Sequence, residues 1–119
     1  MKKTILIYDD DEEILLLCKI ILSRYDYIIE TFTTCYNKLT DLETLKPDVI
    51  LMDLWIPEMG GEKAITLAKQ NERTKHVPIL IFSANPDINN ISLKINANGY
   101  LEKPFSVEDF IKIIQTHTQ

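Results

Sequence analysis

Hydrophobic residues fall into two alternating kinds of segment along this chain. Short, nearly continuous apolar runs are typical of strands that a parallel sheet buries on both faces. Five such runs predict strands over residues 4–8, 27–32, 49–53, 79–83 and 100–102. Between the runs, apolar residues recur at helical spacing. The first helix, predicted over residues 12–23, is marked by Ile14, Leu17, Cys18 and Ile21.

Four more helices are expected after the first, because the same spacing returns after each later strand. Their markers are Leu39, Leu42 and Leu45, with an end at Lys46-Pro47, for the second; Ala64, Ile65 and Ala68 for the third; Asn85 as cap and Pro86 as first residue for the fourth; and a capping box of Ser106 and Asp109 with the inner stripe Val107, Phe110, Ile111 and Ile114 for the fifth. This alternation predicts an α/β fold, a flavodoxin-like doubly wound (βα)5 three-layer sandwich. Its five-stranded parallel sheet has the order 2-1-3-4-5.

Composition limits the function classes. A chain of 119 residues suits one domain over residues 1–119, and without a tail or linker we expect no output domain. No apolar run approaches the length of a membrane span or a signal peptide, so we expect a cytoplasmic protein with no membrane partner. The net charge of −5 and the lack of a Lys/Arg cluster argue against direct nucleic-acid binding. Cys18 and Cys35 are expected to be buried free thiols.

Polar residues follow the carboxyl ends of the strands. Asp9 and Asp10 follow the first strand, Asp53 ends the third, Ser83 the fourth, and Lys103 comes after the fifth. Read alone, the acids at 9–13 suit a solvated helix start, and Asp53 could be a metal ligand, a nucleophile or a helix cap. In the predicted strand order, however, the first and third strands are neighbours at the switch point, so three carboxylates would meet in one crevice.

Three crowded carboxylates repel one another, and a cation relieves that repulsion. An all-oxygen site with few protein ligands suits Mg²⁺. An aspartate beside a metal can attack a phosphoryl group and hold it as an aspartyl phosphate. Lys103 would neutralise phosphoryl oxygens, and Ser83 would donate a hydrogen bond to one of them. These residue types together indicate phosphoryl acceptance by Asp53.

The chain resembles the response-regulator receiver domains (CheY-like) of two-component signalling. Four pieces carry the resemblance in order over essentially the whole sequence, at residues 5–10, 53–61, 83–84 and 99–105. The resemblance implies that a partner histidine phosphorylates Asp53, that Asp10 and Asp53 bind Mg²⁺, and that Asp9 acts through water. It also implies that the Trp55 backbone carbonyl is a further metal ligand.

The same resemblance implies a switch pair and a phosphate contact. Ser83 and Tyr100 match the pair in which the hydroxyl moves to the phosphate and the aromatic ring turns inward. Lys103 matches the phosphate-contacting lysine, and Lys103-Pro104 matches a cis peptide bond. The implied signalling surface is formed by the fourth helix, the fifth strand and the fifth helix, through which the protein is a monomer or forms a phosphorylation-dependent dimer.

The leading interpretation is therefore a stand-alone receiver that a histidine kinase or a histidine phosphotransfer protein phosphorylates. Phosphorylation would switch the binding of an unknown downstream protein. We do not expect this receiver to be an enzyme in its own right. One alternative is an aspartate-nucleophile phosphatase, which typically needs a second aspartate two residues after the nucleophile, where this chain has Trp55. Another is an interaction module that works without phosphorylation. We also hypothesise that Trp55 shields the phosphate and prolongs the phosphorylated state.

The first helix is apolar around much of its circumference. Leu15, Leu16 and Leu22 all fall outside a single narrow stripe. Two explanations stay open at this stage: deep burial of the helix, or a docking face for a kinase or phosphotransfer helix bundle.

Overall fold

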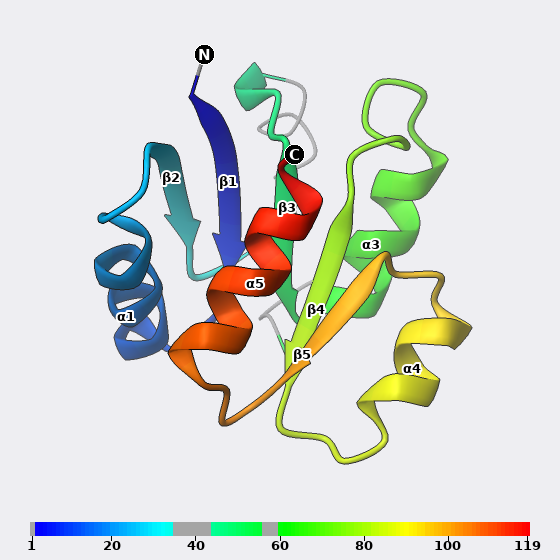
Figure 1. Ribbon diagram of the computed structural model, residues 1–119. Coiled ribbons are helices and arrows are strands. Elements are labelled where there is room, and N and C mark those ends of the chain that lie inside the picture. The colour runs from blue at the N-terminus through cyan, green and yellow to red at the C-terminus, as the bar shows by residue number, and fades with distance from the viewer. Residues whose placement is uncertain (1, 35–43, 56–59) are drawn as a thin grey trace.

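The computed structural model describes residues 2–34, 44–55 and 60–119. Within them the chain forms five strands and four helices (Figure 1). The strands are β1 (Lys3–Tyr8), β2 (Tyr27–Phe32), β3 (Val49–Asp53), β4 (Ile79–Ser83) and β5 (Gly99–Glu102). The helices are α1 (Glu12–Leu22), α3 (Gly61–Gln70), α4 (Ile88–Lys94) and α5 (Val107–His117).

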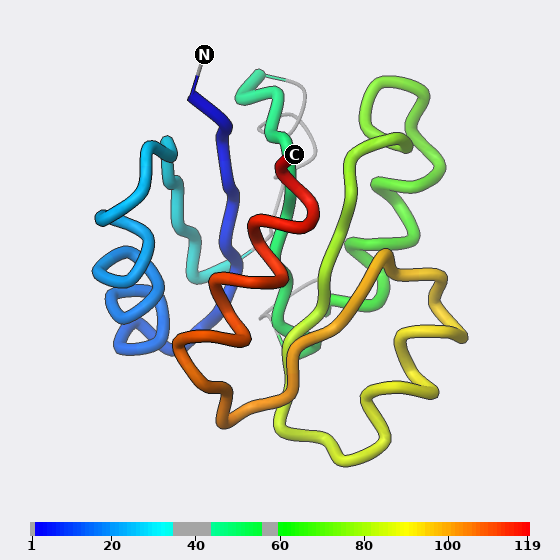
Figure 2. Tube along the Cα trace, in the orientation of Figure 1, coloured from blue at the N-terminus to red at the C-terminus, as the bar shows by residue number. Residues whose placement is uncertain are grey.

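All five strands belong to one parallel sheet in the order β2-β1-β3-β4-β5. The predicted flavodoxin-like topology is thereby confirmed. Figure 2 traces the chain outward from β1 to β2, back across the sheet to β3, and then on to β4 and β5. Because every strand points the same way, the carboxyl ends share one edge of the sheet, at the bottom in Figure 1. From β1 the chain places β2 on one side and β3 on the other. In an open α/β sheet, ligands bind at the carboxyl ends of the strands where the winding changes side in this way.

Two separate hydrophobic clusters hold the layers together, because successive side chains of a strand point to opposite faces. Every residue of β3 and β4 is buried, as the continuous apolar runs predicted. On one face, strand residues such as Leu6 and Ile50 pack against α3 and α4. On the other, residues such as Ile7 and Leu51 pack against α1 and α5.

The predicted helix starts were correct for α5 and wrong for α4. The Ser106 side chain accepts the N–H of Asp109 at 3.0 Å, which confirms the capping box. Asn85 does not cap α4; the N-cap is Asp87, and the helix begins at Ile88. The reason is local: the Asn85 side chain accepts the Asp87 N–H at 2.9 Å, which makes a turn before the helix.

Burial also divides residues that the sequence pattern grouped together. In α1, Leu15 and Leu22 are buried, whereas Leu16 is 59% exposed, so deep burial explains the first two only. In the inner stripe predicted for α5, Phe110 and Ile114 are buried, but Val107 is exposed because it lies in the first turn, before the helix reaches the sheet.

Two predictions fall largely or wholly outside the described residues. The second predicted helix is described only at residues 44–45, which are helical, and Cys35 is not described. Cys18 is a buried free thiol, as predicted. None of the helices in the described part of the chain has the length and apolar character needed to cross a bilayer.

Candidate functional site

Asp9 is fixed at the carboxyl end of β1 by the loop that leads into α1. Its backbone N–H donates to the carbonyl of Phe32, 3.0 Å away on β2. Its carboxylate Oδ1 accepts the N–H of Asp11 at 2.9 Å, and Asp11 in turn caps α1 by accepting the N–H of Glu13. The Asp9 side chain is fully buried, so it points under the loop rather than into solvent.

Asp53 ends β3 one strand away and is also buried. Its Oδ1 accepts the N–H of Trp55 at 3.2 Å, which orients the carboxylate at the sheet edge. The start of α3 packs directly on this turn, where the N–H of Gly61 donates to the carbonyl of Leu54 at 3.1 Å. A Cβ at Gly61 would lie only 2.3 Å from the Asp53 carbonyl oxygen, so glycine allows this close approach.

Lys103 joins the two carboxylates. Its Nζ lies 2.7 Å from Asp9 Oδ2 and 3.5 Å from Asp53 Oδ2, and the side chain is 19% exposed. Two features position it. Its backbone N–H donates to the carbonyl of Ser83 at 2.9 Å, and its ammonium group lies 4.4 Å from the centroid of the Phe82 ring. The Lys103-Pro104 peptide bond is cis.

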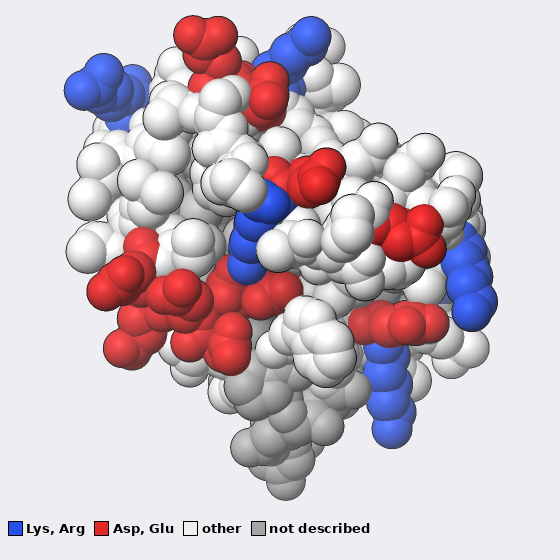
Figure 3. Space-filling view, turned by 90° about the horizontal axis from the view of Figure 1, so that it is seen from below, with Lys and Arg blue, Asp and Glu red and all other residues white. Residues whose placement is uncertain are grey.

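Three carboxylates, those of Asp9, Asp10 and Asp53, offer oxygen atoms that all lie within 4.8 Å of one another. Figure 3, which views this edge of the sheet, shows acidic side chains gathered into one patch with a basic side chain beside them. Burial raises the pKa of the Asp9 carboxyl, and the hydrogen bond from Lys103 works in the opposite direction. Clustered hard oxygen donors with this spacing fit Mg²⁺.

The two residues of the predicted switch pair lie on adjacent strands beside this cluster. Ser83 is buried at the end of β4, and its Oγ accepts the N–H of Asn85 at 3.1 Å. Tyr100 lies on β5, where it pairs with Ile81, two positions before Ser83 along β4. Tyr100 is 40% exposed, so its side chain is not buried among the strands and helices.

Comparisons with known proteins agree with this geometry. A family model described as the response regulator receiver domain matches residues 5–115. The chain belongs to this family. Receiver domains are the signalling modules of two-component systems.

Relatives of this receiver domain include a longer transcriptional regulator and solved receiver structures. The alkaline phosphatase synthesis transcriptional regulatory protein PhoP of Bacillus subtilis is 35% identical over 109 residues, which cover 89% of this chain and 44% of PhoP. The chain spans about half or less of the length of the first curated relatives it matches.

Among solved structures, the receiver domain of the sensor histidine kinase PA1611 from Pseudomonas aeruginosa is 26% identical, with a TM-score of 0.88 and coverage of 99% of this chain and 98% of that one. It has a magnesium ion coordinated in its active-site cleft. The chemotaxis response regulator CheY4 of Vibrio cholerae is 25% identical, with a TM-score of 0.87 and coverage of 98% and 99%.

Trp55 lies two residues after Asp53, beside the candidate site. It is 78% exposed, so in this conformation its ring does not cover the Asp53 carboxylate. Residues 56–59 of the predicted signature lie outside the described residues. Sequence reasoning missed the role of Phe82, whose ring lies against the Lys103 ammonium group; only its place at the end of a buried strand could have indicated it.

Proposed function

We propose that this receiver domain accepts a phosphoryl group on Asp53, in a Mg²⁺-dependent reaction, from a phosphohistidine of a kinase or a histidine phosphotransfer protein. The observation that carries the proposal is the position of Lys103 Nζ, within 2.7 Å of Asp9 and 3.5 Å of Asp53 at the sheet edge. A cation that is mostly removed from water, between two buried carboxylates, is costly to build for stability alone, because the charges must be desolvated. The arrangement is better explained by a reaction that brings in further negative charge.

The chemical step needs an acceptor oxygen that the phosphoryl group can reach, and relief of charge repulsion. An Asp53 carboxylate oxygen attacks the phosphorus, an O–P bond forms, and the N–P bond of the donor breaks. The bonding electron pair returns to the imidazole nitrogen. Asp10 and Asp53 would hold Mg²⁺ directly, with Asp9 through water and the Trp55 carbonyl as further ligands. When bound, Mg²⁺ supplies positive charge that offsets the repulsion between the carboxylates and the phosphoryl oxygens.

Lys103 already lies where that new charge would develop. The arriving phosphoryl oxygens compete with Asp9 for its ammonium group, which the 3.5 Å contact to Asp53 keeps within reach. Ser83 Oγ accepts the N–H of Asn85, and a hydroxyl that accepts one hydrogen bond can still donate its own proton to a phosphoryl oxygen. Movement of this hydroxyl towards a phosphate would break or lengthen that bond, and the space it leaves would admit the Tyr100 ring.

Phosphorylation then changes partner binding. The Ser83–Tyr100 movement would alter the surface formed by α4, β5 and α5, where an unidentified downstream protein or a second receiver would bind. The phosphodonor would approach the carboxyl end of the sheet from the side of α1, where the first turn is acidic and Leu17 and Ile20 are exposed further along the helix. Those two residues would provide the apolar contact for a helical bundle.

Intact-mass spectrometry after incubation with a small phosphodonor tests the proposal. The wild type should gain the mass of one phosphoryl group when Mg²⁺ is present and none when it is removed by a chelator. Asp53→Asn should gain nothing. Asp26→Asn, at an exposed acid that forms an ion pair with Lys2, is the matched control and should behave as wild type. A phosphoryl gain by Asp53→Asn equal to that of the control would overturn the assignment.

A further inference from the structure

The outer edge of β2 presents backbone groups that the sheet does not use. The carbonyl of Phe32 accepts the N–H of Asp9, so Phe32 turns its backbone groups towards β1. In a parallel sheet, alternate residues turn theirs to the opposite side. Ile29 and Thr31 therefore point their N–H and C=O groups away from β1, and no other described residue bonds to them there.

Within the described residues, this edge lacks the usual protection against pairing with another chain. Edge strands are commonly short, bulged, or guarded by lysine or proline. β2 has the sequence YIIETF, contains neither of those residues, and pairs with β1 in unbroken register over all six of its positions. Its one charge, on Glu30, lies on the sheet face opposite Thr31, because neighbouring side chains of a strand alternate.

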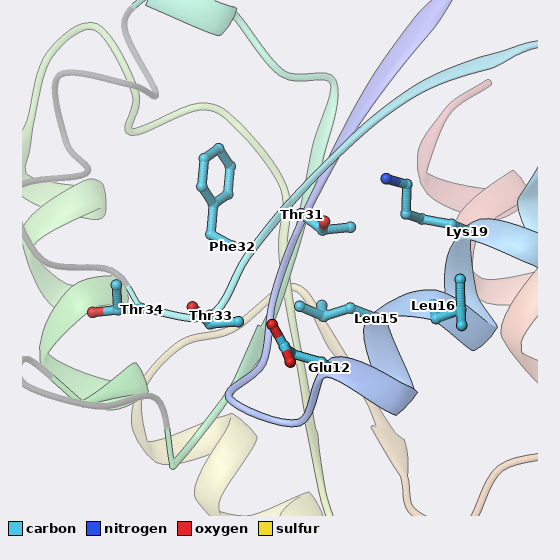
Figure 4. Close-up of a pocket in the computed structure, with 8 residues that line it drawn as sticks. All are labelled: Glu12, Leu15, Leu16, Lys19, Thr31, Phe32, Thr33 and Thr34. Atoms are coloured by element: carbon cyan, nitrogen blue, oxygen red, sulfur yellow. The ribbon is translucent and has the colours of Figure 1, made fainter.

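A groove lies between α1 and the carboxyl end of β2, where Thr31 and Phe32 of the strand and Thr33 and Thr34 after it form one wall. It has a volume of about 470 Å³, and its helix wall contains Leu15, Leu16 and Lys19. Figure 4 shows Thr31 on the helix side of the strand, facing that wall across the groove, and Phe32 on the other side. Leu16, which lines the groove, is 59% exposed. An unused strand edge thus lies beside an unpartnered apolar helix flank.

We propose that this groove binds an extended peptide segment of a partner protein, which adds to β2 as a further strand. The unpaired groups of Ile29 and Thr31 require an occupant that brings its own backbone donors and acceptors in strand geometry. Leu16 favours an apolar or β-branched side chain at the position that faces the helix.

The charges of the groove set the polarity of that peptide. Glu12 also lines the groove, seven residues before Lys19, which is about 10 Å along a helix. Side chains on one face of a strand recur every two residues, about 6.6 Å apart. The peptide should therefore carry a basic residue near Glu12 and an acidic residue near Lys19, four positions apart, with an apolar residue midway between them on the same face.

A phage-displayed library of random octapeptides, selected against the unphosphorylated protein, is the first test. The enriched peptides should share the alternating pattern with paired opposite charges, and a synthetic copy should shift the backbone amide resonances of residues 29–33 and of α1 in ¹⁵N–¹H spectra. Enrichment no greater than that on an uncoated surface, or shifts confined to another face, would overturn the proposal.

Matched variants at one position separate backbone pairing from other contacts. Thr31→Pro removes the outward N–H at an edge position where proline is tolerated, whereas Thr31→Val keeps it. Binding should weaken at least about tenfold in Thr31→Pro and stay within about twofold in Thr31→Val, because only the first loses a backbone hydrogen bond. Leu16→Asp should also weaken binding about tenfold or more, because it removes the apolar wall.

The peptide itself provides a second, independent measurement if Thr31→Pro does not fold. Methylation of the backbone nitrogens that face β2 should abolish binding, and methylation of the alternate nitrogens should not. Equal tolerance at both sets would overturn the proposal. So would sedimentation showing a dimer that Thr31→Pro dissociates, since a second copy would then be the occupant. Asp53→Asn should bind the peptide as wild type does, so this test does not depend on phosphorylation.

Discussion

Replacement of Lys103 by methionine would leave two buried carboxylates without their cation. The ammonium group donates to Asp9 at 2.7 Å, where the carboxylate is fully buried, and lies 3.5 Å from Asp53. Methionine keeps most of the length and apolar surface of the lysine stem, so the change removes charge and hydrogen bonding more than packing. We expect the folded state to lose stability near neutral pH in metal-free buffer.

The size of that loss follows from the burial of the groups. Removal of one partner from a buried ion pair costs about 3–5 kcal/mol. Lys103 is 19% exposed and its second contact is long, so the effect should be smaller, about 2–4 kcal/mol. That is a large part of the stability of about 5–15 kcal/mol that is usual for a domain.

The deficit should also depend on pH, through Asp9. Burial already raises the pKa of this carboxyl, and the Lys103 hydrogen bond opposes the rise, so the variant should have a still higher pKa. A folded-state pKa above the unfolded value stabilises the fold at acid pH, and this contribution is lost as pH rises through the folded pKa. The difference between variant and wild type should therefore shrink on acidification and grow towards neutrality.

Urea unfolding followed by far-ultraviolet circular dichroism, across an acid-to-neutral pH series with a chelator present, measures both effects. Lys112→Met, at an exposed position of α5, is the matched control and should change stability by less than about 0.5 kcal/mol. A Lys103→Met variant as stable as this control, or a deficit that is constant with pH, would refute the reasoning.

Three further predictions concern other parts of the structure. Gly61→Ala should destabilise the protein more than Gly60→Ala in thermal unfolding, because a Cβ at Gly61 would lie 2.3 Å from a backbone oxygen. A Cβ at Gly60 would meet open space, so the cost there is only that of a positive φ of +80° in a non-glycine residue, about 1–2 kcal/mol. Equal losses of stability in the two variants would contradict this. Burial raises the pKa of the Cys18 thiol to about 12. Iodoacetamide should therefore leave Cys18 unmodified near neutral pH in the native protein and alkylate it in urea, as peptide mapping can show. Alkylation of the native protein would show that the thiol is accessible. Trp55 is the single tryptophan and lies beside the site, so its fluorescence should change when Mg²⁺ and then a phosphodonor are added. If the ring shields the phosphate, Trp55→Asn should lose phosphate faster than wild type. An unchanged rate of dephosphorylation would remove the shielding hypothesis.

The sequence was informative where one residue class could serve only one structural purpose. The uninterrupted apolar runs of β3 and β4 admit burial on both faces and little else, and the strand ends then place Asp9, Asp53 and Lys103 at one edge. This is why the fold and the gathering of the candidate site residues could be predicted together.

What the sequence could not supply were contacts decided by geometry across the chain. Lys103 and Asp9 are separated by 94 positions, and nothing local in either segment indicates that their side chains meet at 2.7 Å. The exposure of Leu16 beside buried Leu15 depends on how α1 is rotated against the sheet, which a broad apolar pattern leaves open. The predicted start of α4 was wrong because Asn85, a residue type that often caps helices, instead makes a turn before this helix.

The central claim is that the carboxylates at the ends of β1 and β3 form one magnesium-dependent site whose acceptor is Asp53. Borohydride trapping of the phosphorylated residue tests this claim most directly. Borohydride reduces an acyl phosphate to an alcohol, so it converts a phosphorylated aspartate into homoserine, which peptide sequencing by mass spectrometry locates. We predict homoserine at position 53 after treatment with a phosphodonor and Mg²⁺, and unmodified aspartate there when Mg²⁺ is withheld. Homoserine at another acidic position, or at 53 regardless of the metal, would contradict the account.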